Sequence, residues 1–157
     1  MTSKIEANLA TLGLALPEKN APAANYIAYQ RAGNIIYVSG QICKWNGELL
    51  YKGAVEKDVS LDDAVKAAEI CALNMLLQLK AACNGNLDNL KSCLKLSVYI
   101  KSDADFKSHA TVANGASDIF IKTMGDKGQH TRISMGCISL PADATVEICG
   151  VFEVENI

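Results

Sequence analysis

Two charged side chains in the last quarter of the chain have types and spacing suited to chemistry. Arg132 stands at the entrance of one β-forming run, and Glu147 stands inside the next. A guanidinium is a planar fork of donors that can bind a carboxylate bidentately and in a fixed orientation. A carboxylate in a β-forming run is costly to cover when it is unpaired. The sequence therefore indicates an arginine able to bind an anion, followed by a glutamate that needs a partner or an accessible position.

Other reactive side chains form no comparable pattern. His130 is a conceivable general base, but the sequence offers it no partner, and His109 falls on the surface of a predicted helix. The six cysteines include no C-x-x-C pair, and only two histidines accompany them, so we expect no metal site. We interpret the cysteines as free, buried thiols in a reducing compartment, with a single reactive thiol as the alternative.

The runs that carry Arg132 and Glu147 are typical of two strands on either side of a turn at Leu140–Asp143. Pro141 cannot donate a hydrogen bond to a ladder and marks the break between them. Period-two alternation places Glu147 on the face opposite its apolar neighbours. Those neighbours are Val146, Ile148, Gly150 and Phe152.

The earlier part of the chain shows the periodicities of two helices and three strands. Apolar residues recur at helical spacing after Ser60, which with Asp63 forms a plausible capping box, and Asn84 supplies the stop. A short amphipathic helix ends near Gly13. The predicted elements are strands at 26–31, 34–42 and 89–101, helices at 60–82 and 105–124, a connector at 17–24 and a loop at 43–57.

This order predicts a single domain over residues 1–157, in which 1–20 form the N-terminal helix and connector. The fold class is α+β, with one mixed sheet and two main helices packed on one of its faces. Half of the residues are hydrophobic, a fifth are charged, and the net charge is −2, which disfavours nucleic-acid binding. With no membrane-spanning run and no secretory signal, we expect a cytoplasmic protein without membrane contact.

Several segments resemble the RidA/YjgF family of enamine/imine deaminases, also called L-PSP endoribonucleases. GNIIYVSGQI resembles the family's Ser-Gly-Gln-Ile element, and RISMGCISLPADATVEI resembles its Arg…Leu-Pro…Val-Glu-Ile ending. APAANYIAYQ and DFKSHATVANGASDIF resemble the first strand and second helix. The N-terminal helix suggests a divergent branch. The resemblance implies a chorismate-mutase-like sandwich, assembled as a homotrimer with ligand sites between subunits.

The resemblance also implies roles for six residues. Arg132 would hold the carboxylate of a small 2-imino or 2-keto acid, and Glu147 would orient the water that hydrolyses an imine to a keto acid and ammonia. We expect no cofactor for this reaction, because a protonated imine is already electrophilic. The other implied substrate-binding positions are Tyr29, Gly40, Asn114 and Ser134. We expect Arg132 and Glu147 to face a crevice shared by neighbouring protomers, close enough to share one water.

Plainer interpretations remain open beside these roles. Arg132 could form a surface ion pair, Glu147 a salt bridge across the trimer, and Tyr29 and Asn114 simple packing contacts. Ser134 stands where the family often has cysteine, and Cys149 where it often has a second acid. A carboxylate-binding trimer without turnover is therefore one alternative function. An endoribonuclease or translation inhibitor is the other, which the acidic charge balance disfavours.

Overall fold

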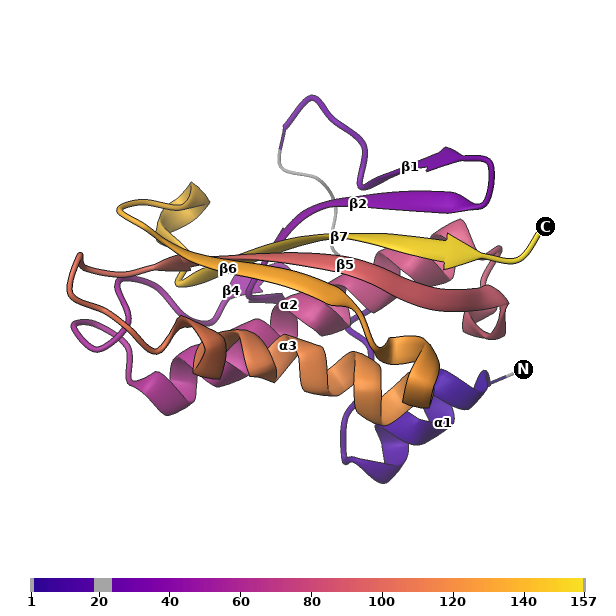
Figure 1. Ribbon diagram of the computed structural model, residues 1–157, viewed down its shortest axis with the longest axis horizontal. Coiled ribbons are helices and arrows are strands. Elements are labelled where there is room, and N and C mark those ends of the chain that lie inside the picture. The colour runs from indigo at the N-terminus through magenta and orange to yellow at the C-terminus, as the bar shows by residue number, and fades with distance from the viewer. Residues whose placement is uncertain (1, 19–23, 157) are drawn as a thin grey trace.

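Within residues 2–18 and 24–156, which the computed structural model describes, five strands form one mixed sheet and two long helices lie against one of its faces (Figure 1). The strand order is β1-β2-β7-β5-β6. The strands are β1 (Tyr29–Ala32), β2 (Ile35–Ile42), β5 (Leu90–Lys101), β6 (Thr131–Cys137) and β7 (Val146–Val154). The predicted α+β class is confirmed.

The two long helices are α2 (Leu61–Ala82) and α3 (His109–Met124). The Ser60 side chain caps α2 by accepting a hydrogen bond from the Asp63 amide at 3.1 Å. A shorter helix, α1 (Lys4–Thr11), has a complete capping box between Ser3 and Glu6. It docks beside α3, where Asn8 Nδ2 donates to the Thr123 carbonyl at 2.8 Å (Figure 1).

The connection through α3 determines which strands are neighbours. β5 and β6 pair in parallel because α3 carries the chain back across the sheet between them, whereas every other pair in this sheet is antiparallel. β6 is consequently an edge strand. β7 lies inside the sheet, between β2 and β5, so the strands of Arg132 and Glu147 are not neighbours.

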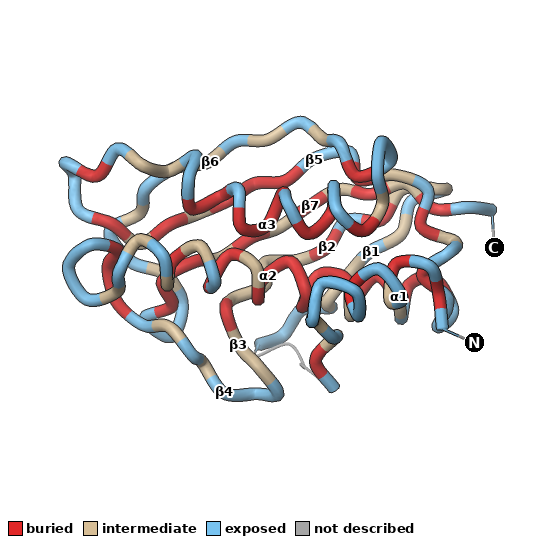
Figure 2. The backbone as a smooth tube through the Cα atoms, turned by 90° about the horizontal axis from the view of Figure 1, so that it is seen from below, coloured by how far each residue is buried: buried red, intermediate tan, exposed pale blue. Residues whose placement is uncertain are grey.

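The two faces of the sheet have opposite character, as the alternation in the sequence predicts. On the helix-covered face, Val146, Ile148 and Phe152 of β7 have no solvent exposure. Figure 2 shows this burial continuing along β5 and the inner sides of α2 and α3. On the other face, Ile133 is 46% exposed and Met135 is 43% exposed. No helix among the described residues covers that open face.

Several predicted boundaries differ from the structure. The first strand begins at Tyr29, three residues later than predicted, and α3 begins at His109 because an irregular turn precedes it. The predicted loop at 43–57 contains a two-stranded hairpin of β3 (Lys44–Trp45) and β4 (Glu48–Leu49). Of the predicted connector at 17–24, residues 19–23 lie outside the described part of the chain. Short 3₁₀ turns occupy η1 (Leu87–Asn89), η2 (Gly125–Gly128) and η3 (Pro141–Asp143).

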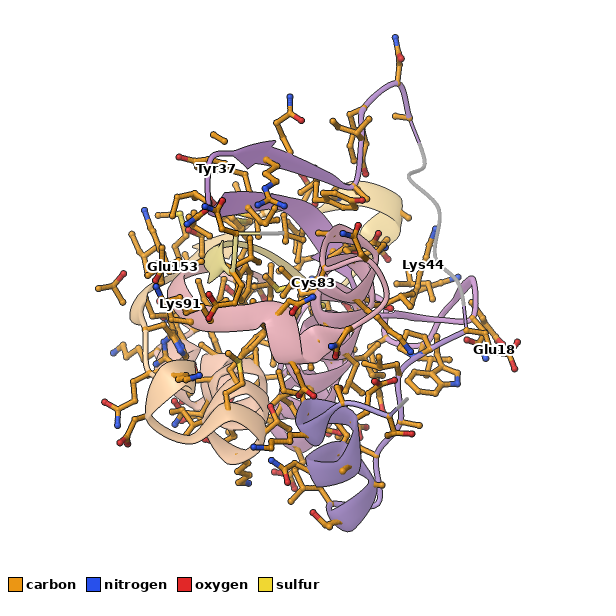
Figure 3. All side chains as sticks on the ribbon, turned by 90° about the vertical axis from the view of Figure 1, so that its right-hand side faces the viewer. Glu18, Tyr37, Lys44, Cys83, Lys91 and Glu153 are labelled. Atoms are coloured by element: carbon orange, nitrogen blue, oxygen red, sulfur yellow. The ribbon has the colours of Figure 1, made fainter. Side chains whose placement is uncertain are left out.

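The thiols are free, and most of them belong to the core. Four cysteines are buried, among them Cys83 at the end of α2 (Figure 3). Cys137 and Cys149 are partly exposed. At the near end of the sheet in the same view, Lys91 and Glu153 form a 3.0 Å ion pair across β5 and β7.

Candidate functional site

Arg132 lies at the edge of the sheet with its guanidinium turned toward α3. Its Nη1 donates to Asn114 Oδ1 at 2.9 Å and to Ser117 Oγ at 3.0 Å. Ser117 Oγ is also 2.9 Å from His130 Nε2, and His130 Nδ1 is 2.7 Å from the Gly128 carbonyl oxygen. We call Arg132, Asn114, Ser117 and His130 the arginine cluster. It borders a surface pocket of about 360 Å³.

The arrangement of α3 and β6 produces this cluster. Asn114 and Ser117 are three residues apart on α3, so their side chains project from the same side of the helix. Arg132 pairs in register with the buried Leu96 of β5, which puts its side chain on the helix-covered face. No carboxylate among the described residues pairs with Arg132, so its charge is available to a ligand.

Glu147 occupies a separate pocket on the open face of the sheet. The pocket has a volume of about 300 Å³ and is lined by Gly40, Tyr99, Leu140, Glu147 and Cys149. We call it the glutamate pocket. A Cβ atom at Gly40 would lie 2.2 Å from Glu147 Oε1, well inside van der Waals contact. Glycine at position 40 therefore makes room for the carboxylate.

The environment of Glu147 makes its carboxyl hold a proton more readily than an exposed glutamate does. Burial raises the pKa of this carboxyl above its usual value. No hydrogen-bond donor or ion-pair partner from residues 2–18 or 24–156 meets the carboxylate, which agrees with desolvation as the cause. A half-buried carboxylate whose pKa is raised is a stronger base than an exposed one, which suits it to accept a proton and return it.

One chain does not bring Arg132 and Glu147 within reach of one water. β5 separates their strands, which puts about 10 Å between them across the sheet. Register through Tyr99 matches Glu147 with Met135, three residues along β6 from Arg132, which adds roughly another 10 Å along the strand. The side chains also lie on opposite faces. The expectation of a shared water therefore fails within a single chain.

The other predicted site residues divide between these two places or lie outside them. Asn114 joins Arg132, and Gly40 joins Glu147. Ser134 is on β6, on the same face as Arg132, and is partly buried. Tyr29 is on β1, at the opposite edge of the sheet from β6, where it packs against the core.

Four further residues at these places were not predicted from the sequence. Ser117 lies one turn beyond Asn114, a spacing that could have suggested it once Asn114 was chosen. His130 finds a partner only because α3 folds back beside β6. Tyr99 and Leu140 line the glutamate pocket, and no sequence signal connects them to Glu147.

Residues 2–18 and 24–156 contain no group of three or more His, Cys, Asp or Glu side chains that could hold a metal ion. None of the helices in these ranges has both the length and the apolar composition needed to cross a bilayer.

A mixed sheet with two long helices on one face is the architecture expected of the chorismate-mutase-like class of α+β proteins. Residues 6–154 match the family described as "YjgF/chorismate_mutase-like, putative endoribonuclease". The chain belongs to this family, as its resemblance to RidA/YjgF proteins predicted.

Individual relatives agree with this assignment. Protein TCP17 of Trypanosoma cruzi is 36% identical over 99% of this chain and 97% of its own. The protein Atu1372 of Agrobacterium tumefaciens, of unknown function, is 39% identical with a TM-score of 0.91, covering 97% of this chain and 93% of its own. E. coli TdcF, whose structure contains bound serine, is similar in fold, with a TM-score of 0.59. It is 18% identical in sequence, and the match covers 89% of this chain and 94% of TdcF.

Proposed function

We propose that this protein hydrolyses 2-imino acids to 2-keto acids and ammonia, at a site where Arg132 and Glu147 come from different copies of the chain. The observation that carries the proposal is the partnerless, half-buried carboxylate of Glu147 above Gly40, with its raised pKa. A surface salt bridge would instead lower the pKa of a carboxyl. The environment of Glu147 therefore favours proton transfer over an ion pair.

The reaction needs one water and no cofactor. Arg132 holds the substrate carboxylate and fixes the position of the imine carbon. The imine reacts in its form protonated on nitrogen. Glu147 takes a proton from the water as the water oxygen bonds to the imine carbon and the electrons of the carbon–nitrogen double bond move to nitrogen, which forms a neutral carbinolamine. The protonated Glu147 then gives this proton to the amine nitrogen. The carbon–nitrogen bond breaks as the hydroxyl proton passes to Glu147 and from there to ammonia, so a keto acid and ammonium leave and the carboxylate is regenerated.

The need for a second copy follows from the separation of the two side chains. Arg132 is on an edge strand, and Glu147 is on an open face that no described helix covers. A neighbouring protomer that packs its β6 edge across this face would bring the two together. The same-fold protein TdcF binds serine, a small amino acid, which supports a small carboxylate as ligand. The homotrimer implied by the family resemblance would supply such an interface.

The glutamate pocket also favours a class of imino acid. Besides Glu147, its lining consists of the backbone of Gly40 and the side chains of Tyr99, Leu140 and Cys149. These walls carry no cation that could pair with an acidic substrate side chain. The preferred substrate therefore has a short aliphatic side chain.

A complementation experiment tests the proposal. Arg132→Ala and Glu147→Gln are purified separately, then unfolded and refolded as an equimolar mixture, and ammonia release from freshly generated 2-aminoacrylate is measured. Each variant alone should be inactive. If each site takes Arg132 from one chain and Glu147 from another, about a quarter of the sites in the mixture are intact, and about a quarter of the wild-type rate returns.

Two results would refute parts of the proposal. A mixture no more active than the separate variants means that one chain supplies both residues or that the assignment is wrong. If the wild-type protein releases ammonia no faster than buffer alone, it has no deaminase activity. In that case the alternative is a trimer that binds small carboxylates without turnover, and keto-acid binding that depends on Arg132 would identify it.

A further inference from the structure

The arginine cluster restricts how Arg132 can meet a ligand. One guanidinium nitrogen, Nη1, has two hydrogens, and both are used, toward Asn114 Oδ1 at 2.9 Å and Ser117 Oγ at 3.0 Å. Among residues 2–18 and 24–156, no acceptor meets the Nε hydrogen or those of Nη2. These two nitrogens form one edge of the guanidinium, which matches the two oxygens of a carboxylate.

The proton positions along the cluster can be assigned by chemistry. The Gly128 carbonyl oxygen can only accept, so His130 Nδ1 carries the hydrogen of their 2.7 Å bond. In the neutral ring Nε2 is then an acceptor. The Ser117 hydroxyl therefore donates its hydrogen to Nε2 at 2.9 Å. This leaves a lone pair of Ser117 directed at Arg132.

We propose that Ser117 and His130 are positioning residues that hold Arg132 by Nη1, so that the carboxylate of the substrate binds to its Nε–Nη2 edge. This inference rests on the proposed function, because it assumes that Arg132 binds the substrate. It adds a hydrogen-bonded support from Gly128 through His130 and Ser117 to the guanidinium. That support fixes the direction of the free edge before the ligand arrives.

The support is anchored in rigid parts of the fold. Ser117 is 6% exposed and belongs to the inner side of α3. The His130 ring lies edge-on to Phe120, with ring centroids 6.3 Å apart. A Cβ at Gly128 would lie 2.1 Å from the Phe120 carbonyl oxygen, so only glycine lets this turn pack against α3. A guanidinium held by such a rigid support loses little conformational entropy when a ligand binds.

The nearby charges leave the free edge to a ligand. Asp118 borders the same pocket, but its carboxylate is 3.5 Å from Lys122 Nζ, one helical turn along α3. Asn114 and Ser117 contribute neutral oxygens. Hydrogen bonds thus orient the guanidinium of Arg132, and no carboxylate of the described residues neutralises its positive charge.

Binding of 2-ketobutyrate, measured by calorimetry in the absence of turnover, tests this inference. Ser117→Ala removes one of the two acceptors for Nη1 and should weaken binding roughly tenfold, the usual scale for a hydrogen bond to a charged group. Ser117→Thr retains the hydroxyl and should bind within about twofold of the wild type. The uncharged 2-ketobutyramide should bind Ser117→Ala and wild type equally, because only the carboxylate uses the oriented edge.

A second pair of variants avoids the buried position. His130→Ala should weaken 2-ketobutyrate binding, whereas His130→Gln, whose amide oxygen can accept from Ser117, should restore most of it. Equal losses for Ser117→Ala and Ser117→Thr would overturn the inference, as would equal weakening of acid binding and amide binding.

Two other results concern the proposed function itself. If Arg132→Ala binds 2-ketobutyrate as well as the wild type, Arg132 does not bind the substrate and the proposed function is wrong on that point. If binding depends on Ser117 but no ammonia forms, only the catalytic part of that proposal fails.

Discussion

Gly40→Ala should separate catalysis from folding in this protein. The new Cβ would lie 2.2 Å from Glu147 Oε1 and 3.0 Å from the carboxyl carbon. Ordinary contact between such atoms needs more than 3 Å, so the carboxylate must move by about 1 Å. A displacement of that size at a reacting group can cost roughly 100-fold in rate. We therefore expect kcat/KM to fall by about that factor.

The same change should have little effect on stability. Gly40 is outside the left-handed region of φ, so alanine fits its backbone. Replacing glycine there restricts the unfolded chain and stabilises by about 0.4–1 kcal/mol. The displaced Glu147 side chain offsets this gain by a comparable amount, because its flexible end can rotate toward the open pocket. The net change should stay within about 1 kcal/mol, or about 3 °C in Tm.

Ammonia release and thermal unfolding, measured on one preparation, check both expectations. Gly136→Ala is the matched control, because its Cβ would crowd two other polar side-chain ends, Ser102 Oγ at 2.6 Å and His109 Nε2 at 2.9 Å. It should retain the wild-type rate. If Gly40→Ala keeps its activity within a few-fold, or if Gly136→Ala loses as much, the position of Glu147 does not control the reaction and the reasoning fails.

Two further changes address the glutamate pocket. Glu147→Gln should abolish turnover and raise Tm at neutral pH. Burial raises the pKa of Glu147, so its protonated form stabilises the folded chain relative to the unfolded one. That stabilisation is fully present below the unfolded pKa and is lost as pH rises through the folded pKa, whereas the neutral glutamine does not titrate. The Tm gap between Glu147→Gln and wild type should close in acid, and a constant gap would contradict this. Leu140→Ala should lower kcat/KM roughly tenfold for imino acids with a branched aliphatic side chain but little for 2-iminopropanoate, and equal losses for both would exclude Leu140 from the substrate contact.

The sequence predicted best those features that depend on local periodicity. The alternation in β7 correctly placed Val146 and Ile148 in the core and Glu147 on the other face. The helical spacing after Ser60 gave α2 its correct end at Ala82. The start of α3 was predicted too early because residues 105–108 contain no Gly or Pro to mark a break, while the chain there turns off the end of β5 toward the helix.

What the sequence could not supply is the order of strands in the sheet. Arg132 and Glu147 are close along the chain and flank a single turn, which made them look like neighbours in space. From β6 the chain instead passes β5, and β7 pairs with β5 on one side and β2 on the other. Such pairings depend on contacts across the whole domain, and the spacing of two residues does not encode them. For the same reason His130 had no visible partner until α3 placed Ser117 beside it.

This order of strands gives the two charged residues the complementary positions that the proposed assembly requires. An edge strand can approach another molecule without disturbing its own sheet, and an open sheet face can receive it. Arg132 lies on the edge, supported from behind by α3, and Glu147 lies on the face, in a pocket that Gly40 keeps open. If both residues lay on the edge, or both on the open face, a single chain could bring the two charges together and would need no partner. Activity that persisted in a protomer kept monomeric by charged substitutions at Ile133 and Met135 on the open face would therefore contradict a site divided between copies.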